Sequence, residues 1–511
     1  MTNSSEQDGT IREVTREAGL ATRFIHAGLW LTAIRILNRL FFFVRLVVLT
    51  RLLTPTDFGL FGLCMVAVQA MKVLTKSGFW AALLQKQGDV RPYLDTSFVV
   101  SASRGVVLTV LLFAGAGMTS VLMGQPEAAP LLKVVCLGFL AEGLTSPAIV
   151  HYWRDLRLRK ECVYQVVGTV SDLIVSIGAA LMLRNAWALV FGLLARDIAQ
   201  AAVSYVLAPY RITGWGSLSR AKQLFTFGGW IFVTSILMFL VDQGTMLFVG
   251  RILGISALGL YVVASQVGSK PAREFISVLA NPAFVAFSTL QNDLPKLRQA
   301  YVKTLQLISI VAMPTSVAVA VLAKNIVCVF LGDQWASAVD VLVVLALWSG
   351  LQSVNITAYA LFKASGWPGT ETQVRLWQML VVAAAIWPLS RAFDLLGVGV
   401  ALLGSELLVS PLLWQKLRAI VDLRLWLQFR LIFFPALASL CMAVIVSAAG
   451  LWLNDPASIV HLIALTAIGS LAYIVSILAV EFLFDFGAVK LVRQCIAGAL
   501  VRPTSFERGV C

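Results

Sequence analysis

The stretch Arg51-Leu-Leu-Thr-Pro-Thr-Asp-Phe-Gly-Leu-Phe61 is followed, 200 positions later, by the similar stretch Arg251-Ile-Leu-Gly-Ile-Ser-Ala-Leu-Gly-Leu-Tyr261. Both contain R-[LI]-L, a variable segment, and then [FL]-G-L-[FY]. A second pair of related stretches, Gly192–Ile198 and Ala401–Leu407, is separated by 209 residues. Self-similarity at a fixed spacing indicates a duplicated structural unit. The sequence therefore predicts two similar halves.

The composition around these stretches is that of a membrane protein. Of 511 residues, 59% are hydrophobic and 13% are charged, whereas soluble domains have about 45–50% apolar and about 25% charged residues. One core cannot bury this excess, so lipid must surround much of the surface. A membrane-crossing helix needs about 20 mainly apolar residues. We predict an all-α polytopic fold of about fourteen transmembrane helices, at residues 29–50, 58–74, 94–123, 131–150, 161–183, 187–208, 223–250, 257–279, 299–323, 340–362, 371–390, 395–415, 429–453 and 459–484.

The repeat divides these helices into two six-helix lobes and a C-terminal pair. The repeated stretch follows the first predicted helix and again the seventh, an even separation, so the halves run parallel in the membrane. A segment with Pro, Gly, Ser and basic residues joins them, as is typical of a linker. The predicted parts are a cytoplasmic tail at 1–28, a lobe at 29–208, a linker at 209–222, a lobe at 223–418, a helix pair at 429–484 and a cytoplasmic tail at 485–511.

The net charge is +14. We interpret the positive residues as markers of membrane topology and not as a sign of nucleic-acid binding. Most Lys and Arg residues outside the predicted helices fall in the loops on one side of the membrane. The loops on the other side contain only five, which are Arg51, Arg184, Arg251, Lys324 and Arg391. Because basic loops stay in the cytoplasm, we expect both termini there and the chain in the bacterial inner membrane.

The first predicted helix has four polar residues on one face: Arg35, Asn38, Arg39 and Arg45. At 100° per residue they lie within an arc of roughly 120°. An Arg at the bilayer centre costs about 2.5–3.5 kcal/mol on insertion scales. We interpret this face as the wall of a hydrated, positive cavity that attracts phosphate, since the planar guanidinium pairs with phosphate through two bonds. For Arg35 and Arg39 the alternative is that the side chains extend to the cytoplasmic headgroups.

Five carboxylates lie inside predicted helices: Glu142, Asp172, Asp197, Asp242 and Glu406. Buried carboxylates either pair with a cation or bind a coupling proton or sodium ion. Both interpretations stay open at this point. The second repeat places Asp197 and Glu406 at matching positions of the two halves.

Other chemistries have little support in the sequence. The seven Cys are scattered without a CxxC pair, and the three His lie far apart, so we predict neither a metal site nor a disulfide framework. We find no Walker loop and no nucleophile elbow. We expect a transporter that is not an enzyme and that needs no cofactor.

Two segments carry a resemblance to a known family. Arg51-Leu-Leu-Thr-Pro-Thr-Asp-Phe-Gly-Leu60, followed by an apolar helix and then by Gly78-Phe-Trp-Ala-Ala-Leu-Leu-Gln-Lys86, resembles the Wzx-like flippases of the polysaccharide transporter family. These belong to the multidrug/oligosaccharidyl-lipid/polysaccharide superfamily. Lys76 departs from the family, whose members often have an acidic residue there. The family sets no universal binding residues, so none is transferred.

The resemblance implies two lobes around a central cavity, and alternating access. It also implies a substrate, an oligosaccharide repeat unit linked to undecaprenyl pyrophosphate, that is moved to the outer leaflet for exopolysaccharide, capsule or O-antigen synthesis. Lipid-linked oligosaccharide and membrane lipid are then the expected partners, with glycosyltransferases and a polymerase of the same pathway. The alternatives are an ion-coupled multidrug or metabolite antiporter of the same superfamily, and a scaffold or membrane glycosyltransferase.

Overall fold

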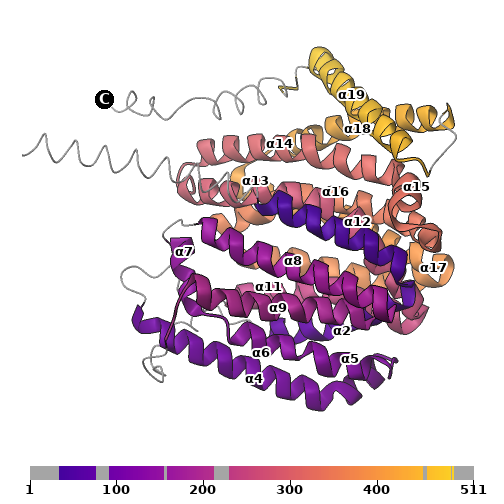
Figure 1. Cartoon of the computed structure of the whole chain (residues 1–511). Helices are drawn as coiled ribbons and strands as arrows, with labels where there is room; N and C mark the ends of the chain where they lie inside the picture. Colours follow the sequence, from indigo (N-terminus) through magenta and orange to yellow (C-terminus); the bar gives the residue numbers. More distant parts are fainter. Residues whose placement is uncertain are drawn as a thin grey trace, which may run out of the picture.

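The structure is a computed structural model that describes residues 34–75, 91–154, 158–211, 229–452, 457–484 and 486–487. Within these ranges every regular element is a helix, and the long helices lie side by side in one bundle (Figure 1). The predicted all-α fold is confirmed. The tail at 1–28, most of the 209–222 linker, the 78–86 motif and nearly all of the 485–511 tail lie outside the described residues.

The N-terminal half begins with a helix at residues 34–52, called the first helix below. The other elements are α2 (Pro55–Leu74), α4 (Arg91–Leu122), α5 (Ala128–Val135), α6 (Leu137–Gly143), η1 (Pro147–Ile149), α7 (Val150–Arg154), α8 (Leu158–Leu183) and α9 (Trp187–Leu207). The stretch predicted as one helix at 131–150 is therefore interrupted. Ser146 has non-helical ψ of 121° directly before Pro147, because a following proline disfavours the α conformation.

The C-terminal half is longer and contains more breaks. Its elements are α11 (Gly229–Phe248), η2 (Val249–Leu253), α12 (Ile255–Gly268), α13 (Lys270–Thr289), α14 (Leu294–Val321), α15 (Ala323–Ile326), η3 (Val327–Leu331), η4 (Asp333–Ala338), α16 (Val339–Ala364), α17 (Pro368–Val421), α18 (Leu425–Trp452) and α19 (Ile459–Phe484). The predicted helix at 257–279 divides at Ser269, where α13 starts with Pro271 in its first turn. Proline suits that position because its missing N–H would have no partner there.

The element α17 consists of two helices that meet at a sharp bend. Phe393 and Asp394 have non-helical angles, with φ of 49° at Asp394. A straight helix of 54 residues would be about 80 Å long, far more than the roughly 30 Å of a bilayer core. The bend therefore turns α17 back and produces the two predicted helices at 371–390 and 395–415.

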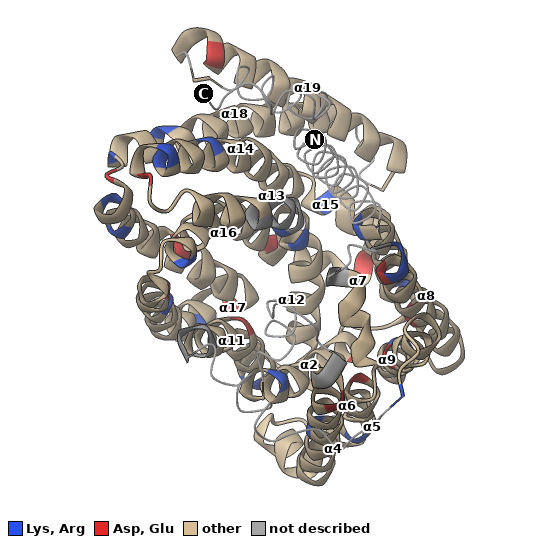
Figure 2. Cartoon of the chain, turned by 90° about the vertical axis from the view of Figure 1, so that its left-hand side faces the viewer, with Lys and Arg blue, Asp and Glu red and all other residues tan. Residues whose placement is uncertain are grey.

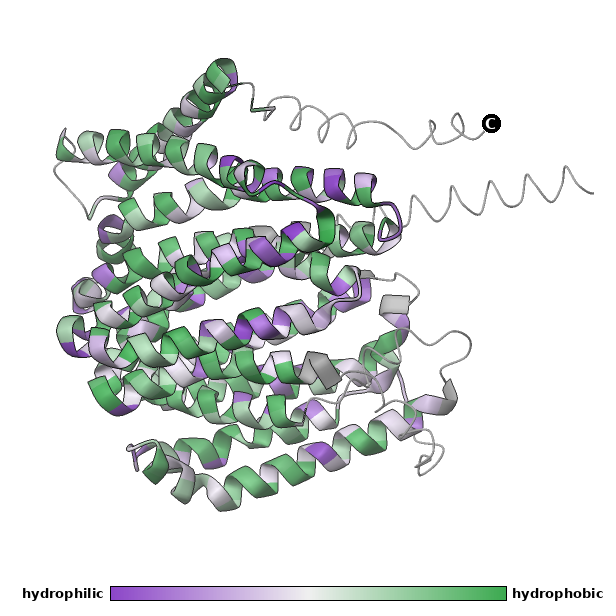
Figure 3. Cartoon of the chain, turned by 180° about the vertical axis from the view of Figure 1, so that it is seen from behind, coloured by the Kyte–Doolittle hydropathy of each residue, from purple (hydrophilic) through white to green (hydrophobic). Residues whose placement is uncertain are grey.

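The outer surface of the bundle is apolar. Side chains such as Met118, Met182 and Phe482 are 72%, 86% and 90% exposed, and hydrophobic residues cover most of the helices (Figure 3). Ten helices of the described residues are long and apolar enough to cross a membrane. The chain is a multi-pass membrane protein, and fourteen as the number of crossings stays a prediction.

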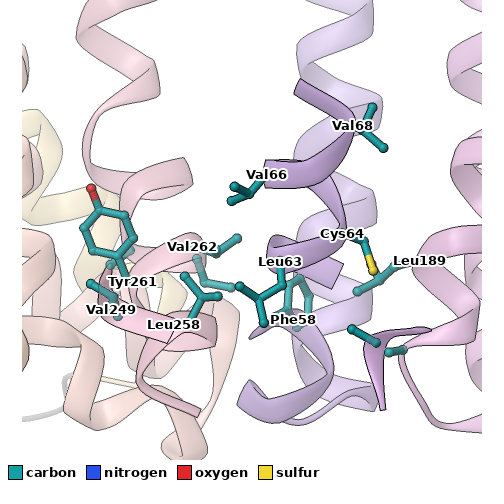
Figure 4. Close-up of a cluster of buried hydrophobic side chains, with 14 of the residues drawn as sticks. Phe58, Leu63, Cys64, Val66, Val68, Leu189, Val249, Leu258, Tyr261 and Val262 are labelled. Atoms are coloured by element: carbon teal, nitrogen blue, oxygen red, sulfur yellow. The ribbon is translucent and has the colours of Figure 1, made fainter. Parts of the chain in front are cut away.

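The core is shared between the two predicted halves. One cluster of buried side chains includes Leu49 and Leu189 of the first half together with Leu258, Leu342 and Val398 of the second. The halves contact each other mainly where α2 packs against α12 and α11 (Figure 4). Charged residues are sparse along the helices (Figure 2), so the few that lie inside the bundle define the candidate site.

Candidate functional site

The first helix has a polar face and an apolar face. Arg35, Asn38 and Arg39 are half-buried, and the side chain of Arg45 is only 15% exposed. On the other face, Ile36 is 65% and Leu40 is 56% exposed, as expected for side chains in contact with lipid. The structure thus places the four predicted residues on the face that is turned away from the most exposed apolar side chains. Their role in binding stays a prediction.

Arg45 is paired inside the N-terminal half. Its Nε atom lies 3.0 Å from Oδ1 of Asp172 on α8, and both side chains are about 85% buried. The N–H group of the same nitrogen points at Oγ of Ser176, at 3.1 Å. Arg45 is therefore bound to two residues one helical turn apart, and Asp172 supplies the negative charge that stabilises it inside the bundle.

Two positive residues of α13 lie near the first helix. The charges that act most strongly on Lys270 are those of Arg39, Arg45 and Arg273. Lys270 Nζ is 3.9 Å from the ring centre of Phe42, and Arg273 Cζ is 4.7 Å from that of Trp348. We call Arg39, Arg45, Lys270 and Arg273 the cationic group. Its members come from both halves of the chain.

Lys270 and Arg273 are not among the residues predicted from the sequence. The only signal for them is that Lys270 and Pro271 interrupt the apolar run of the helix predicted at 257–279. In the described part of the chain neither Lys270 nor Arg273 forms an ion pair, and the buried Nε of Arg273 has no hydrogen-bond partner. Like charges gathered inside a membrane protein need water or an anion beside them.

The remaining carboxylates of the N-terminal half lie in a second group of charges. Glu142 on α6 is 2.6 Å from Nζ of Lys72 on α2, and both side chains are more than a third exposed. Asp197 on α9 packs over Gly138, where a Cβ atom would lie only 2.7 Å from Oδ2 of Asp197. Lys72 and Arg196 are the positive charges that act on Asp197.

Glu406 is the centre of a buried network in the C-terminal half. Asn355 Nδ2 donates to its Oε1 at 2.8 Å and Gln378 Nε2 to its Oε2 at 2.6 Å. Arg375 Nη1 donates to Oε1 of Gln378 at 2.8 Å and stacks on Tyr359, with Cζ 4.1 Å from the ring centre. Glu406 and Arg375 are only 2% and 6% exposed.

These contacts bear on the five predicted carboxylates. Asp172, Glu142 and Glu406 each have a polar partner in the structure, and the half-buried Asp242 on α11 is among the negative charges that act on Arg375. The described residues hold no group of three or more potential metal ligands. Ion pairs are thus described for Asp172 and Glu142, whereas Glu406 is held by amide groups. A role of the five carboxylates in ion coupling or in buried pairing stays a prediction.

An apolar cavity lies apart from all these charges. It has a volume of about 480 Å³ and is lined by α14, α16 and α18, with Val317, Leu347 and Phe433 among its walls. Since α18 belongs to the predicted C-terminal helix pair, this cavity lies where that pair packs against helices of the second predicted lobe.

Fold and charges together define a class of protein, namely an all-helical, multi-pass membrane protein with charged groups enclosed between its helices. A model of the family described as polysaccharide biosynthesis protein matches residues 48–340. This range is more than half of the chain, and the chain belongs to that family. The resemblance noted for residues 51–60 and 78–86 is thereby confirmed.

Curated relatives carry matching descriptions. The chain is 26% identical over 479 residues to the succinoglycan biosynthesis transport protein ExoT of Rhizobium meliloti (strain 1021), covering 89% of this chain and 94% of the relative. It is 24% identical over 407 residues to the lipopolysaccharide biosynthesis protein WzxC of Escherichia coli (strain K12), covering 76% of this chain and 81% of the relative.

Two solved structures share the fold. One is the lipid II flippase MurJ in an inward closed conformation, with a TM-score of 0.67, 14% identity, and coverage of 90% of this chain and 99% of that one. The other is an inward-facing multidrug resistance transporter of the MATE family, with a TM-score of 0.61, 13% identity, and coverage of 75% and 96%. Both likenesses extend over most of this chain and show that it shares their all-helical membrane fold.

Proposed function

We propose that this protein moves an oligosaccharide repeat unit linked to undecaprenyl pyrophosphate across the bacterial inner membrane, by alternating access, with both termini in the cytoplasm. The exported unit feeds exopolysaccharide, capsule or O-antigen synthesis. Glycosyltransferases and a polymerase of that pathway are the proposed partners. Relatives described as polysaccharide transport and biosynthesis proteins support this function.

The observation that carries the proposal is the cationic group. Lys270 of α13 lies within the influence of the charges of Arg39 and Arg45 of the first helix and of Arg273, so the group has members from both halves of the chain. Arg45 is already paired with Asp172, whereas Lys270 and Arg273 form no ion pair within the described residues. A positive group of this kind suits a pyrophosphate, which is compact and carries a high negative charge. Arginine binds such a group through two parallel hydrogen bonds, and lysine binds it as a point charge.

The position of the cationic group, with members from both halves of the chain, suits alternating access. When a cargo phosphate binds between the first helix and α13, it offsets the mutual repulsion of Arg39, Arg45, Lys270 and Arg273. A ligand changes a conformational equilibrium by its difference in affinity for the two states. A bound pyrophosphate therefore favours the state in which all four charges reach it.

The second candidate function is an ion-coupled multidrug or metabolite antiporter, because the fold is shared with a multidrug transporter. The charges argue against a cationic drug as cargo, since the enclosed group between the halves is positive. An antiporter that carries an anionic metabolite would fit the same charges, and the binding experiment below separates it from a flippase.

The test is binding and export by variants of the α13 charges. We expect Lys270→Gln and Arg273→Gln each to weaken binding of undecaprenyl pyrophosphate to the purified protein by about tenfold, since hydrogen bonds to charged groups contribute about 1.5–3 kcal/mol. Arg273→Lys should keep part of the affinity. Lys303→Gln, which removes an exposed positive charge of α14, serves as the matched control.

Polymer output of cells that carry each variant gives the second measurement. Reduced output with Lys270→Gln and Arg273→Gln at normal expression, but not with Lys303→Gln, would support the flippase. If the purified protein binds undecaprenyl pyrophosphate no better than undecaprenol, or if the two α13 variants bind as tightly as the unchanged chain, the proposed function is wrong.

A further inference from the structure

Three aromatic rings follow one another along the exposed side of α18. Trp426, Phe429 and Phe433 are 72%, 41% and 44% exposed. The ring centres of Trp426 and Phe429 are 5.7 Å apart, those of Phe429 and Phe433 are 5.1 Å apart, and both pairs are stacked. Spacings of three and four residues keep side chains on one face of a helix. We call these three rings the aromatic strip, which begins in the first turn of α18.

The aromatic strip leads into the apolar cavity between α14, α16 and α18. Phe433 is a wall of that cavity, and Leu437 and Leu440 continue the same face of α18 along it. At a rise of 1.5 Å per residue, Leu440 lies about 20 Å further along α18 than Trp426. One leaflet contributes about 15 Å to the hydrocarbon core of a bilayer. The strip and the cavity together therefore extend over the depth of one leaflet, which is the length of an acyl chain.

A charged pocket lies at the other end of the aromatic strip. It has a volume of about 420 Å³ and is lined by Arg298 of α14, by Asp422 and Arg424 between α17 and α18, and by Trp426 and Leu427. Among the described residues neither arginine forms an ion pair. Because Trp426 belongs both to this pocket and to the strip, the positive pocket and the apolar path are continuous.

The charged pocket lies at a membrane surface. The end of α17 and the starts of α14 and α18 meet there, and several positive residues lie beside α14 in the end-on view (Figure 2). In the topology proposed above, the loop between α17 and α18 is cytoplasmic. Tryptophan is enriched at the level of the headgroups, and the cytoplasmic leaflet carries anionic lipids that attract arginine. The pocket is thus placed to receive a lipid headgroup.

The charges of the pocket select among headgroups. Two guanidinium groups bind a phosphate through paired hydrogen bonds, and they exceed the single carboxylate of Asp422 in charge. That carboxylate only accepts hydrogen bonds, so it suits a headgroup with hydroxyl donors. A glycerol headgroup supplies both the net negative charge and the hydroxyls. A choline headgroup has neither of them.

We propose that an anionic phospholipid of the cytoplasmic leaflet binds here, with a phosphate and glycerol headgroup between Arg298 and Arg424. One of its acyl chains follows the aromatic strip into the apolar cavity, so the lipid connects α18 with α14 and α16. The first helix and α13, which hold the cationic group, contribute no wall to either cavity. The assignment to the cytoplasmic leaflet rests on the proposed topology, whereas the site itself does not depend on the proposed cargo.

The headgroup is tested by titrating the purified full chain with dioleoyl phosphatidylglycerol and measuring bound lipid by native mass spectrometry. We expect Arg298→Gln and Arg424→Gln each to weaken binding about fivefold, which is the contribution of one arginine near a membrane surface. Dioleoyl phosphatidylcholine should bind more weakly and to the same extent in all variants. Lys303→Gln removes an exposed charge of α14 outside the pocket and should bind like the unchanged chain.

The chain path has a test of its own. Leu437→Trp fills part of the apolar cavity, so we expect it to weaken binding of dioleoyl phosphatidylglycerol at least fivefold, because buried methylene groups contribute much of a lipid's affinity. Dioctanoyl phosphatidylglycerol, whose chains are too short to reach Leu440, should bind equally to both proteins. Leu478→Trp on α19 changes a side chain that is 48% exposed and lies outside the cavity, and it is the matched control.

Arg424 is exposed, so its variant keeps the test decisive even if Arg298→Gln fails to fold. Unchanged binding of phosphatidylglycerol by both arginine variants, or equal binding of phosphatidylcholine, would overturn the site. It would also be overturned if undecaprenyl pyrophosphate displaced phosphatidylglycerol and lost affinity in the same two variants, since the groove would then hold cargo. Loss of phosphatidylglycerol binding in these variants with full affinity for cargo in Lys270→Gln would leave the phospholipid site intact and overturn the proposed cargo site.

Discussion

At the scale of single residues, the Arg45–Asp172 pair allows a prediction about stability. Asp172→Asn should lower the unfolding free energy in detergent by about 3–5 kcal/mol, because it leaves Arg45 buried without its counter-charge. The double variant with Arg45→Gln should recover part of the loss. The exposed pair Lys72–Glu142 is the control, and Glu142→Gln should change stability by about 1 kcal/mol or less. Thermal unfolding of the purified variants measures this, and equal losses for Asp172→Asn and Glu142→Gln would contradict the assigned burial.

The charged residues could be predicted from the sequence more readily than their partners. The polar face of the first helix follows from 100° per residue. The pairing of Arg45 with Asp172 joins residues 127 positions apart, and that of Lys72 with Glu142 joins residues 70 apart, so neither follows from local spacing. Lys270 and Arg273 carry no such signal, because a charge in an apolar run looks like an interruption of a helix until the fold brings it beside other charges.

At the scale of elements, the apolar runs predict most of the helices, whereas the positions of the breaks within those runs come from the structure. The interruption before Pro147 and the start of α13 at Lys270 both occur next to a proline, and the sequence contains that signal. The bend at Phe393 and Asp394 has a weaker signal, because no proline or glycine stands at either position. It is stabilised by packing, since Gly397 lies directly against the backbone of Leu389.

That bend gives a prediction with its own control on the same element. Gly397→Ala would place a methyl group 2.0 Å from the carbonyl oxygen of Leu389, so we expect it to destabilise the protein by about 1–3 kcal/mol through overpacking. Gly404→Ala, also on α17, meets no atom within 4 Å and should stabilise the helix by about 0.5–1 kcal/mol. Melting temperatures of the two variants should therefore move in opposite directions. A lower melting temperature for both variants would show that the helix packing around Gly404 is tighter than described.

At the scale of the whole molecule, the repeat predicted two halves, and the structure shows how dependent they are on each other. The largest apolar cluster includes residues from Leu46 to Leu402 and so combines both halves in one core, whereas the cluster around Phe362 and Leu413 lies within the second half alone. The repeated stretch at residues 51–61 and 251–261 contributes to this contact, because Gly59 of α2 lies against the backbone of Ile255 and Gly259 of α12 lies against that of Pro55. The sequence alone does not predict that the repeated motif contacts its own copy, because similarity between two segments says nothing about which surfaces meet.

This arrangement leads to a prediction about a divided chain. Residues 1–215 and 216–511, cut within the predicted linker, should each accumulate poorly when expressed alone, because each leaves its share of the common core exposed. Expressed together they should co-purify and restore polymer output, since no described helix is interrupted by the cut.

A cut at 291–292, between α13 and α14, is the control. It separates the first helix and α13 from α16, and α13 packs against both α14 and α16, so the fragments must re-form contacts inside one half. We expect that pair to restore markedly less output. Equal recovery from both cuts would mean that the halves are not the units of assembly, and the predicted lobes would have to be redrawn.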